Sequence, residues 1–231
     1  MAPPRARPGL RQRTEKLKFF LSSDVLFSDP SATIASEVEL VPANCFAPLD
    51  FEGIYGRKAP VEVDLGCGDG SFLAALAAEN PAKDFLGIER LLGRVCSACR
   101  KIERSGLNNA RILQFEISYA VEQLLPKNSV ASFHVMFPDP WPKRRHAPRR
   151  LVTENFLASL HRALAANGTV QIATDETEYY RQITRLISQS SLFAVIPDAV
   201  PANAMSKFEK RFTLGGVKIH RLVLRKVSPV T

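Results

Sequence analysis

Short apolar runs alternate with longer amphipathic stretches over the central part of the chain. Five apolar runs have the length of buried strands: 61–65, 85–88, 110–115, 130–137 and 170–173. The stretches between them repeat apolar residues at the spacing of one helix face. They cover 71–79, 91–104, 152–166 and a last helix that ends near residue 189. Strands that alternate with helices predict a parallel, doubly wound α/β sheet.

Two glycine-containing pairs predict where elements end. An Asn-Gly pair at 167–168 follows the third helix and is typical of a C-terminal stop. A Gly-Gly pair at 215–216 separates two strand-like runs, 210–214 and 217–225, and predicts a tight hairpin. The hairpin would add an antiparallel strand at one side of the mostly parallel sheet.

The first sixty residues lack the alternating pattern. Prolines interrupt 19–60, and the first 18 residues carry six basic side chains against a single acid. We therefore expect a basic, mobile N-terminal arm over 1–40, with a solvated tail as the alternative, and one folded domain over 41–231. The formal net charge of +8 favours an anionic partner, of which nucleic acid is the commonest.

No apolar run reaches the roughly 18 residues that a membrane-spanning helix needs. The N-terminus also lacks the apolar segment of a secretory signal. We therefore expect a cytoplasmic protein with no membrane partner, and an organelle transit peptide is the alternative for the Arg-rich start. Cys96 and Cys99 form a CxxC pair inside a helical stretch, but no second pair completes a zinc site. We expect free thiols and no metal.

The segment VEVDLGCGDGSF leads from the first strand into the first helix through Gly66, Gly68 and Gly70. Glycine permits a tight turn and lets a ligand approach the backbone, and ligands of open α/β sheets bind beyond the carboxyl ends of strands. The spacing is GxGxG, whereas a dinucleotide fingerprint needs GxGxxG and Ser71 occupies its third glycine position. The loop therefore predicts a cofactor other than a dinucleotide.

Carboxylates surround this loop, and they favour a cationic cofactor over an anionic pyrophosphate. Glu62 and Asp64 share one face of the first strand, while Glu89 and Glu116 end the second and third strands. S-adenosylmethionine carries a positive sulfonium and a positive amino group, so these acids suit it. Glu89 is placed to accept from ribose hydroxyls and Glu116 to lie near an adenine. The alternative is a purely structural turn with solvated acids.

The fourth strand ends in FPDPWPKRRHAPRR, which contains the only tryptophan of the chain. Each proline disfavours the α region for the residue before it, so we expect Phe137, Asp139 and Trp141 to be extended. The stiff backbone would aim the Asp139 carboxylate, and Trp141 would offer a stacking face for a base. The cationic run would bind phosphates through Lys143, Arg144, Arg145, His146, Arg149 and Arg150. A solvated, proline-rich surface loop is the alternative.

With these residues in view, the chain closely resembles the bacterial tRNA (guanine-N7-)-methyltransferases. The resemblance covers about residues 60–227 and rests on EVDLGCGDG, FLGIE, FPDPWPKRRHAPRRL, ATD and SKFEKRF. It implies a Rossmann-like class I methyltransferase fold, S-adenosylmethionine as methyl donor and tRNA as partner. It also implies that N7 of guanosine 46, in the variable loop, is the methylated atom. We expect a monomer or a homodimer.

The resemblance further implies roles for individual residues. Cofactor contacts are implied for Glu62, Glu89 and Glu116. Asp139 would bind cofactor and guanine and would be the catalytic residue. Contacts to tRNA are implied for Lys143, Asp175, Ser206, Lys207, Phe208 and Glu209.

Three positions depart from the family pattern. Glu116 stands where Asp or Asn is usual, and Ser206 stands where Thr is usual. Asp64 stands where many members have glycine, which leaves open whether Glu62 or Asp64 holds the cofactor's amino group.

Alternatives remain at two sites and for the function. Asp175 begins a helix with Glu178 three residues on, so it can equally be a helix N-cap. Lys207 and Phe208 suit a phosphate and a base, or belong to a plain loop. The rival functions are methylation of another RNA or of a small molecule, and non-catalytic RNA binding on this fold.

Overall fold

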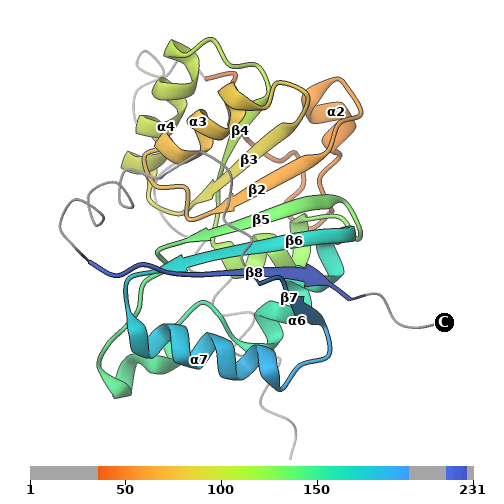
Figure 1. Ribbon diagram of the computed structural model, residues 1–231. Coiled ribbons are helices and arrows are strands. Elements are labelled where there is room, and N and C mark those ends of the chain that lie inside the picture. Colours follow the sequence, from red (N-terminus) through yellow and green to blue (C-terminus); the bar gives the residue numbers. More distant parts are fainter. Residues whose placement is uncertain (1–35, 198–216, 228–231) are drawn as a thin grey trace, which may run out of the picture. The chain divides into compact units, whose positions relative to one another are not determined.

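The computed structural model describes residues 36–197 and 217–227 (Figure 1). All of these except Ser36 belong to one compact unit, Glu37–Thr231. The strands of the described residues are β1 (Glu39–Leu40), β2 (Val61–Leu65), β3 (Asp84–Glu89), β4 (Ala110–Gln114), β5 (Val130–Met136), β6 (Leu164–Thr174), β7 (Phe193–Val195) and β8 (His220–Lys226). They form one sheet in the order β1-β4-β3-β2-β5-β6-β8-β7.

The strands β1 to β6 pair in parallel, and β8 runs antiparallel between β6 and β7. This confirms the predicted, mostly parallel α/β sheet with an antiparallel strand near the C-terminus. The run predicted at 217–225 is observed as β8, which begins at His220 and ends at Lys226. Its predicted hairpin partner at 210–214 lies outside the described residues, and β7 is the outer neighbour that the structure describes. Residues 39–40 of the expected N-terminal arm belong to the sheet as β1.

Helices cover both faces of the sheet. In the described part of the chain they are α2 (Phe51–Tyr55), α3 (Ser71–Glu79), α4 (Leu92–Arg104), α5 (Ile117–Tyr119), the π-helical η1 (Ala120–Leu124), the 3-10 helical η2 (Arg144–Arg149), α6 (Glu154–Ala163) and α7 (Thr177–Ser188). Phe85 and Ile112 pack with buried residues of α3 and α4. Their strand neighbours Leu86 and Leu113 pack with η1, α6 and α7. Because side chains alternate along a strand, the two clusters lie on opposite faces.

The helix predicted over 152–166 ends earlier, at Ala163. Leu164 leaves the helical conformation, is buried, and pairs with Val130 at the start of β6. The Asn-Gly pair at 167–168 therefore lies inside β6 rather than after a helix. A Cβ at Gly168 would stand 2.9 Å from Leu164 Cδ2 and 3.0 Å from a carbonyl oxygen, so the glycine serves a close backbone approach.

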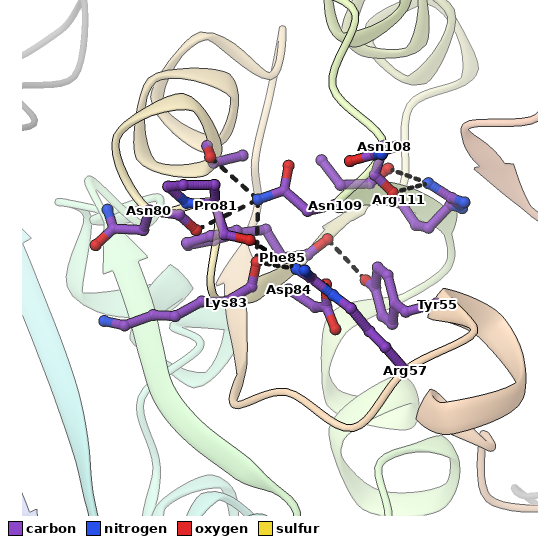
Figure 2. A network of polar contacts seen from close by, with 12 residues as sticks. Tyr55, Arg57, Asn80, Pro81, Lys83, Asp84, Phe85, Asn108, Asn109 and Arg111 are labelled. Carbon is purple, nitrogen blue, oxygen red and sulfur yellow. Dashed lines mark hydrogen bonds and ion pairs between the residues drawn. The ribbon is translucent and has the colours of Figure 1, made fainter.

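Helix α2 lies in the stretch expected to be irregular, and polar contacts join it and the residues after it to the amino end of β3, beside a second set of contacts from Asn109 (Figure 2). The Tyr55 hydroxyl donates to the Phe85 carbonyl at 2.7 Å. Arg57 donates to Asp84 Oδ1 through Nε and Nη2, at 3.0 and 2.7 Å. The Asn109 amide donates to three carbonyls, those of Ala77, Asn80 and Lys83. This network lies at the amino ends of the strands, whereas the glycine loop lies at the carboxyl end of β2.

Candidate active site

The glycine loop leaves the carboxyl end of β2 with a backbone that suits glycine. Gly66, Gly68 and Gly70 have φ of 83°, 56° and 70°, in the left-handed region. Gly66 N–H donates to the Ile88 carbonyl at 2.8 Å, which holds the loop against β3. A Cβ at Gly70 would stand 2.7 Å from Ala98 Cβ, so this glycine also permits close packing against α4.

Glu89 joins this loop to the start of α4. The residue is 5% exposed, and its Oε2 accepts from Gly68 N–H at 3.2 Å. Oε1 accepts from the backbone N–H groups of Arg90 and Leu91 at 2.8 and 2.9 Å. The carboxylate that the sequence predicts at the carboxyl end of β3 is therefore held in place by backbone donors.

Asp64 is a carboxylate without a hydrogen-bond partner among the described residues. It lies two residues before Gly66 and is 2% exposed. Burial raises the pKa of Asp64 to about 7; the charge of His134 opposes this rise and the charge of Glu89 adds to it. A buried carboxylate with no partner costs free energy unless a ligand supplies a cation.

Glu62 lies on the same face of β2 as Asp64, but both of its carboxylate oxygens already have protein partners. Its Oε1 is 2.7 Å from Lys83 Nζ and its Oε2 is 2.8 Å from His134 Nε2. Burial acts to raise the pKa of Glu62, but the hydrogen bonds and charges of these two partners outweigh it, so the pKa is lowered. The third acid of the segment, Asp69, forms an ion pair with Lys101 at 2.7 Å. Of these three acids, Asp64 alone has no protein partner among the described residues.

Glu116 follows β4 and caps α5. Its side chain accepts from Ser118 N–H at 3.1 Å and from Tyr119 N–H at 2.8 Å. The start of α5 approaches the glycine loop, because Ile117 Cδ1 is the nearest atom, at 3.7 Å, to a Cβ placed on Gly66. Glu89 therefore contacts this loop, Asp64 lies just before it, and Glu116 directly precedes the residue that approaches it.

The proline segment leaves β5 with a backbone that differs from the prediction. Phe137 and Trp141 have φ of 54° and 43°, so the expectation that both are extended is wrong. The following prolines disfavour the right-handed α region, and the chain avoids it through positive φ instead. Phe137 N–H donates to the Ala173 carbonyl at 2.8 Å, which fixes this turn to β6. Between the two strained aromatic residues, Asp139 is exposed.

The basic residues after this turn differ in their surroundings. Lys143 and Arg145 are exposed, as predicted for phosphate contacts. The Arg149 guanidinium lies 5.1 Å from the centre of the Trp141 ring, so one face of this ring is already covered. Arg150 is 8% exposed and turned inward, so its predicted contact with phosphate is wrong. Spacing alone gave no sign of this difference between neighbouring arginines.

Asp175 is exposed directly after β6, but it does not cap α7. The N-cap is Glu176, whose side chain accepts from Glu178 N–H at 3.4 Å, so the capping alternative for Asp175 is wrong. The four predicted tRNA contacts at 206–209 lie outside the described residues. The described part of the chain contains no cluster of three or more potential metal ligands and no helix long and apolar enough to span a membrane.

The sheet order and the acid-lined glycine loop define a Rossmann-like methyltransferase. A family model described as "Putative methyltransferase" matches residues 58–222. The tRNA (guanine-N(7)-)-methyltransferase of Thermotoga maritima is 36% identical over 198 residues, which cover 84% of this chain and 63% of that relative. The protein of the same name from Syntrophotalea carbinolica is 33% identical over 180 residues, which cover 75% of this chain and 77% of that relative. This chain therefore belongs to the tRNA (guanine-N7-)-methyltransferase family, which confirms the resemblance and S-adenosylmethionine as methyl donor.

A solved structure supports the fold. It is described as an antibiotic related methyltransferase and superimposes with a TM-score of 0.54 at 16% identity. The match covers 84% of this chain and 98% of that one. At this identity the likeness concerns the fold alone.

Proposed function

We propose that this protein transfers a methyl group from S-adenosylmethionine to N7 of a guanosine in tRNA, and that this is guanosine 46 of the variable loop. The observation that carries the proposal is a pair of carboxylates at the carboxyl ends of two adjacent strands, one within β2 and one after β5. Asp64 is buried near the end of β2 and has no hydrogen-bond partner in the part of the chain that the structure describes, and Asp139 is exposed on the strained turn after β5. The names of the relatives support tRNA as the substrate.

The loop residues fit S-adenosylmethionine. Among the described residues other than its two chain neighbours, a Cβ placed on Gly68 would meet only the Gly66 carbonyl oxygen, at 4.0 Å, so a ligand has room over the loop. Asp64 would hold the amino group, since Glu62 is occupied by Lys83 and His134. When bound, the cofactor supplies an electrophilic methyl group on a positively charged sulfur.

Two further carboxylates complete this cofactor site. Glu89 would accept from the ribose hydroxyls, and Glu116 would lie near the adenine. Both are ordered by backbone donors before any ligand arrives, which lowers the entropy lost on binding.

Asp139 would orient and select the guanine. Guanine N7 has a free lone pair, so the reaction needs alignment rather than a general base. The Asp139 carboxylate can accept from N1–H and the N2 amino group, a donor pair that adenine lacks. Its negative charge would also stabilise the positive charge that develops on the purine during methyl transfer.

The remaining predicted contacts concern the rest of the tRNA. Lys143 and Arg145 are exposed beside this turn and would bind phosphates. Asp175, free of a capping role, and the segment 206–209 stay predicted substrate contacts. We expect the enzyme to act in the cytoplasm, where tRNA is processed, as a monomer or a homodimer.

The direct test is incubation of the full chain with labelled methyl donor and an unmodified tRNA transcript. Borohydride and aniline cleavage then locates any N7-methylguanosine. We expect label at position 46 and none in a transcript with adenosine at that position. Absence of transfer to every transcript, or label on another atom, would refute the proposal. Binding of tRNA that weakens as salt rises would argue against a small-molecule substrate.

A further inference from the structure

Arg150 differs from the other basic residues of its segment because it is buried rather than offered to solvent. It is 8% exposed, whereas its neighbour Arg149 is exposed. Burial of a guanidinium is unfavourable unless its donors are satisfied. The contacts that satisfy Arg150 therefore show what this side chain does.

The Arg150 guanidinium holds the two residues that follow Asp139. Nε donates to the Pro140 carbonyl at 2.7 Å, and Nη2 donates to the Trp141 carbonyl at 3.4 Å. These are the carbonyls of the strained turn, in which Trp141 has a φ of 43°. Strained backbone persists only where its surroundings hold it, and Arg150 supplies two of these contacts.

The same guanidinium is anchored on helix α7. Nη1 donates to Gln182 Oε1, and the guanidinium carbon lies 5.0 Å from the centre of the Tyr179 ring. Tyr179 is fully buried and its hydroxyl accepts from Val152 N–H at 3.1 Å, so this ring is itself fixed. Arg150 thus ties the turn that carries Asp139 to α7, the helix that starts just after Asp175.

We propose that Arg150 is a positioning residue for methyl transfer: it fixes the backbone of residues 139–141 against α7 and so orients Asp139. The inference rests on the proposed function. It predicts that loss of the Arg150 guanidinium lowers kcat. The affinity for S-adenosylmethionine and the number of contacts between the protein and tRNA phosphates should stay unchanged.

The test compares Arg150→Met with Arg185→Met. Arg185 is an exposed arginine on α7, one turn beyond Gln182, and serves as the matched control. For Arg150→Met we expect at least a tenfold fall in kcat, with the Kd for S-adenosylmethionine within threefold of the unaltered protein. Trp141, the only tryptophan, should show red-shifted emission and stronger acrylamide quenching. Arg185→Met should leave both readouts unchanged.

Salt dependence separates positioning from phosphate binding. If Arg150 contacted a phosphate, its loss would lower the slope of log K for tRNA against log salt by about 0.7 to 0.9. An unchanged slope supports positioning; a reduced slope, or an unchanged kcat, overturns it.

A second variant keeps the test valid if Arg150→Met does not fold. Gln182→Leu removes the hydrogen-bond acceptor of Arg150 but keeps Arg150. It should lower kcat and change the fluorescence of Trp141 less than Arg150→Met does. Gln182→Glu keeps an acceptor and should give the kcat and fluorescence of the unaltered protein. Wild-type values for Gln182→Leu would overturn the proposal. The fluorescence readout needs no tRNA, so it also separates failure of this inference from failure of the proposed function.

Discussion

Replacement of Asp64 by asparagine should stabilise the free protein and weaken cofactor binding at the same time. Asp64 is 2% exposed and has no hydrogen-bond partner among the described residues, so its negative charge is costly in the folded state. Asparagine has nearly the same size and cannot ionise. The variant therefore removes the charge and little else.

The size of the stability effect follows from the pKa. Burial raises the pKa of Asp64 from 3.8 to about 7. Between these values the folded state binds more protons than the unfolded state, so the unaltered protein loses stability as pH rises. At 1.36 kcal/mol per pH unit, the loss reaches about 4 kcal/mol at pH 8. Asp64→Asn should therefore match the unaltered protein near pH 4 and exceed it by up to about 4 kcal/mol at pH 8.

Two measurements check this prediction. Urea unfolding from pH 4 to 8 gives the difference in free energy of unfolding between Asp64→Asn and the unaltered protein. Calorimetric titration with S-adenosylmethionine gives affinity, which should fall about tenfold in the unaltered protein from pH 8 to pH 6, as a carboxylate with this pKa becomes protonated. In Asp64→Asn the affinity should be at least tenfold weaker at pH 8 and independent of pH.

Glu62→Gln, two residues before Asp64, provides a control for which we expect a change in the free energy of unfolding of the opposite sign. Because His134 and Lys83 lower the pKa of Glu62, its charge stabilises the folded state above the ordinary pKa of a glutamate, and this contribution is lost as pH falls. Its loss should destabilise the protein at pH 8. If Asp64→Asn were no more stable than the unaltered protein at pH 8, or bound the cofactor equally well, the assignment of Asp64 to the amino group would fail.

Three further predictions concern other parts of the site. Asp139→Ala should lower kcat at least a hundredfold while the Kd for S-adenosylmethionine stays within threefold, measured by labelled methyl transfer and by calorimetry. Gly70→Ala should lower the free energy of unfolding by about 2–4 kcal/mol, measured in urea, because a Cβ at a φ of 70° would stand 2.7 Å from Ala98 Cβ. Asp175→Asn should leave thermal unfolding unchanged, since Glu176 caps α7, and should lower the rate of tRNA methylation.

The sequence predicts the elements whose signals are local. The apolar run of β2 ends at a glycine loop, and α3 starts where the helical spacing starts, so both bounds match the structure. The end of α6 is not local, because Leu164 becomes extended in order to pair with Val130 on another strand. A pattern within the helix holds no trace of that partner.

The site shows the same limit at the level of side chains. Glu62 and Asp64 look equivalent in the sequence, since both face the same side of β2. They differ because Lys83 and His134 reach Glu62 from other parts of the chain. Arg149 and Arg150 also look equivalent in the sequence. Arg150 turns inward because it contacts Gln182 and the buried ring of Tyr179 on α7 and donates to two carbonyls of the strained turn. Residue type predicts candidate chemistry, but long-range partners decide which candidate is free.

Polar groups at the amino ends of the parallel strands have different surroundings from those at the carboxyl ends. This difference helps to distinguish residues that stabilise the fold from residues that bind substrates. At the amino edge, Arg57 and Asn109 donate into a network that joins β3 and β4 to their neighbours (Figure 2). At the carboxyl ends of the strands, Asp64 has no hydrogen-bond partner within residues 36–197 and 217–227, and Phe137 and Trp141 adopt strained backbone. Net stability is a small difference between large terms, so such costs persist only where other contacts offset them. Asp84 Oδ2, in the network at the amino ends, is also buried without a hydrogen-bond partner among the described residues, so an unpaired oxygen alone does not mark a site. At the carboxyl ends, Asp64 and the strained turn lie beside the glycine loop, where a cationic cofactor and a guanine would relieve their cost, and this is why activity is expected there.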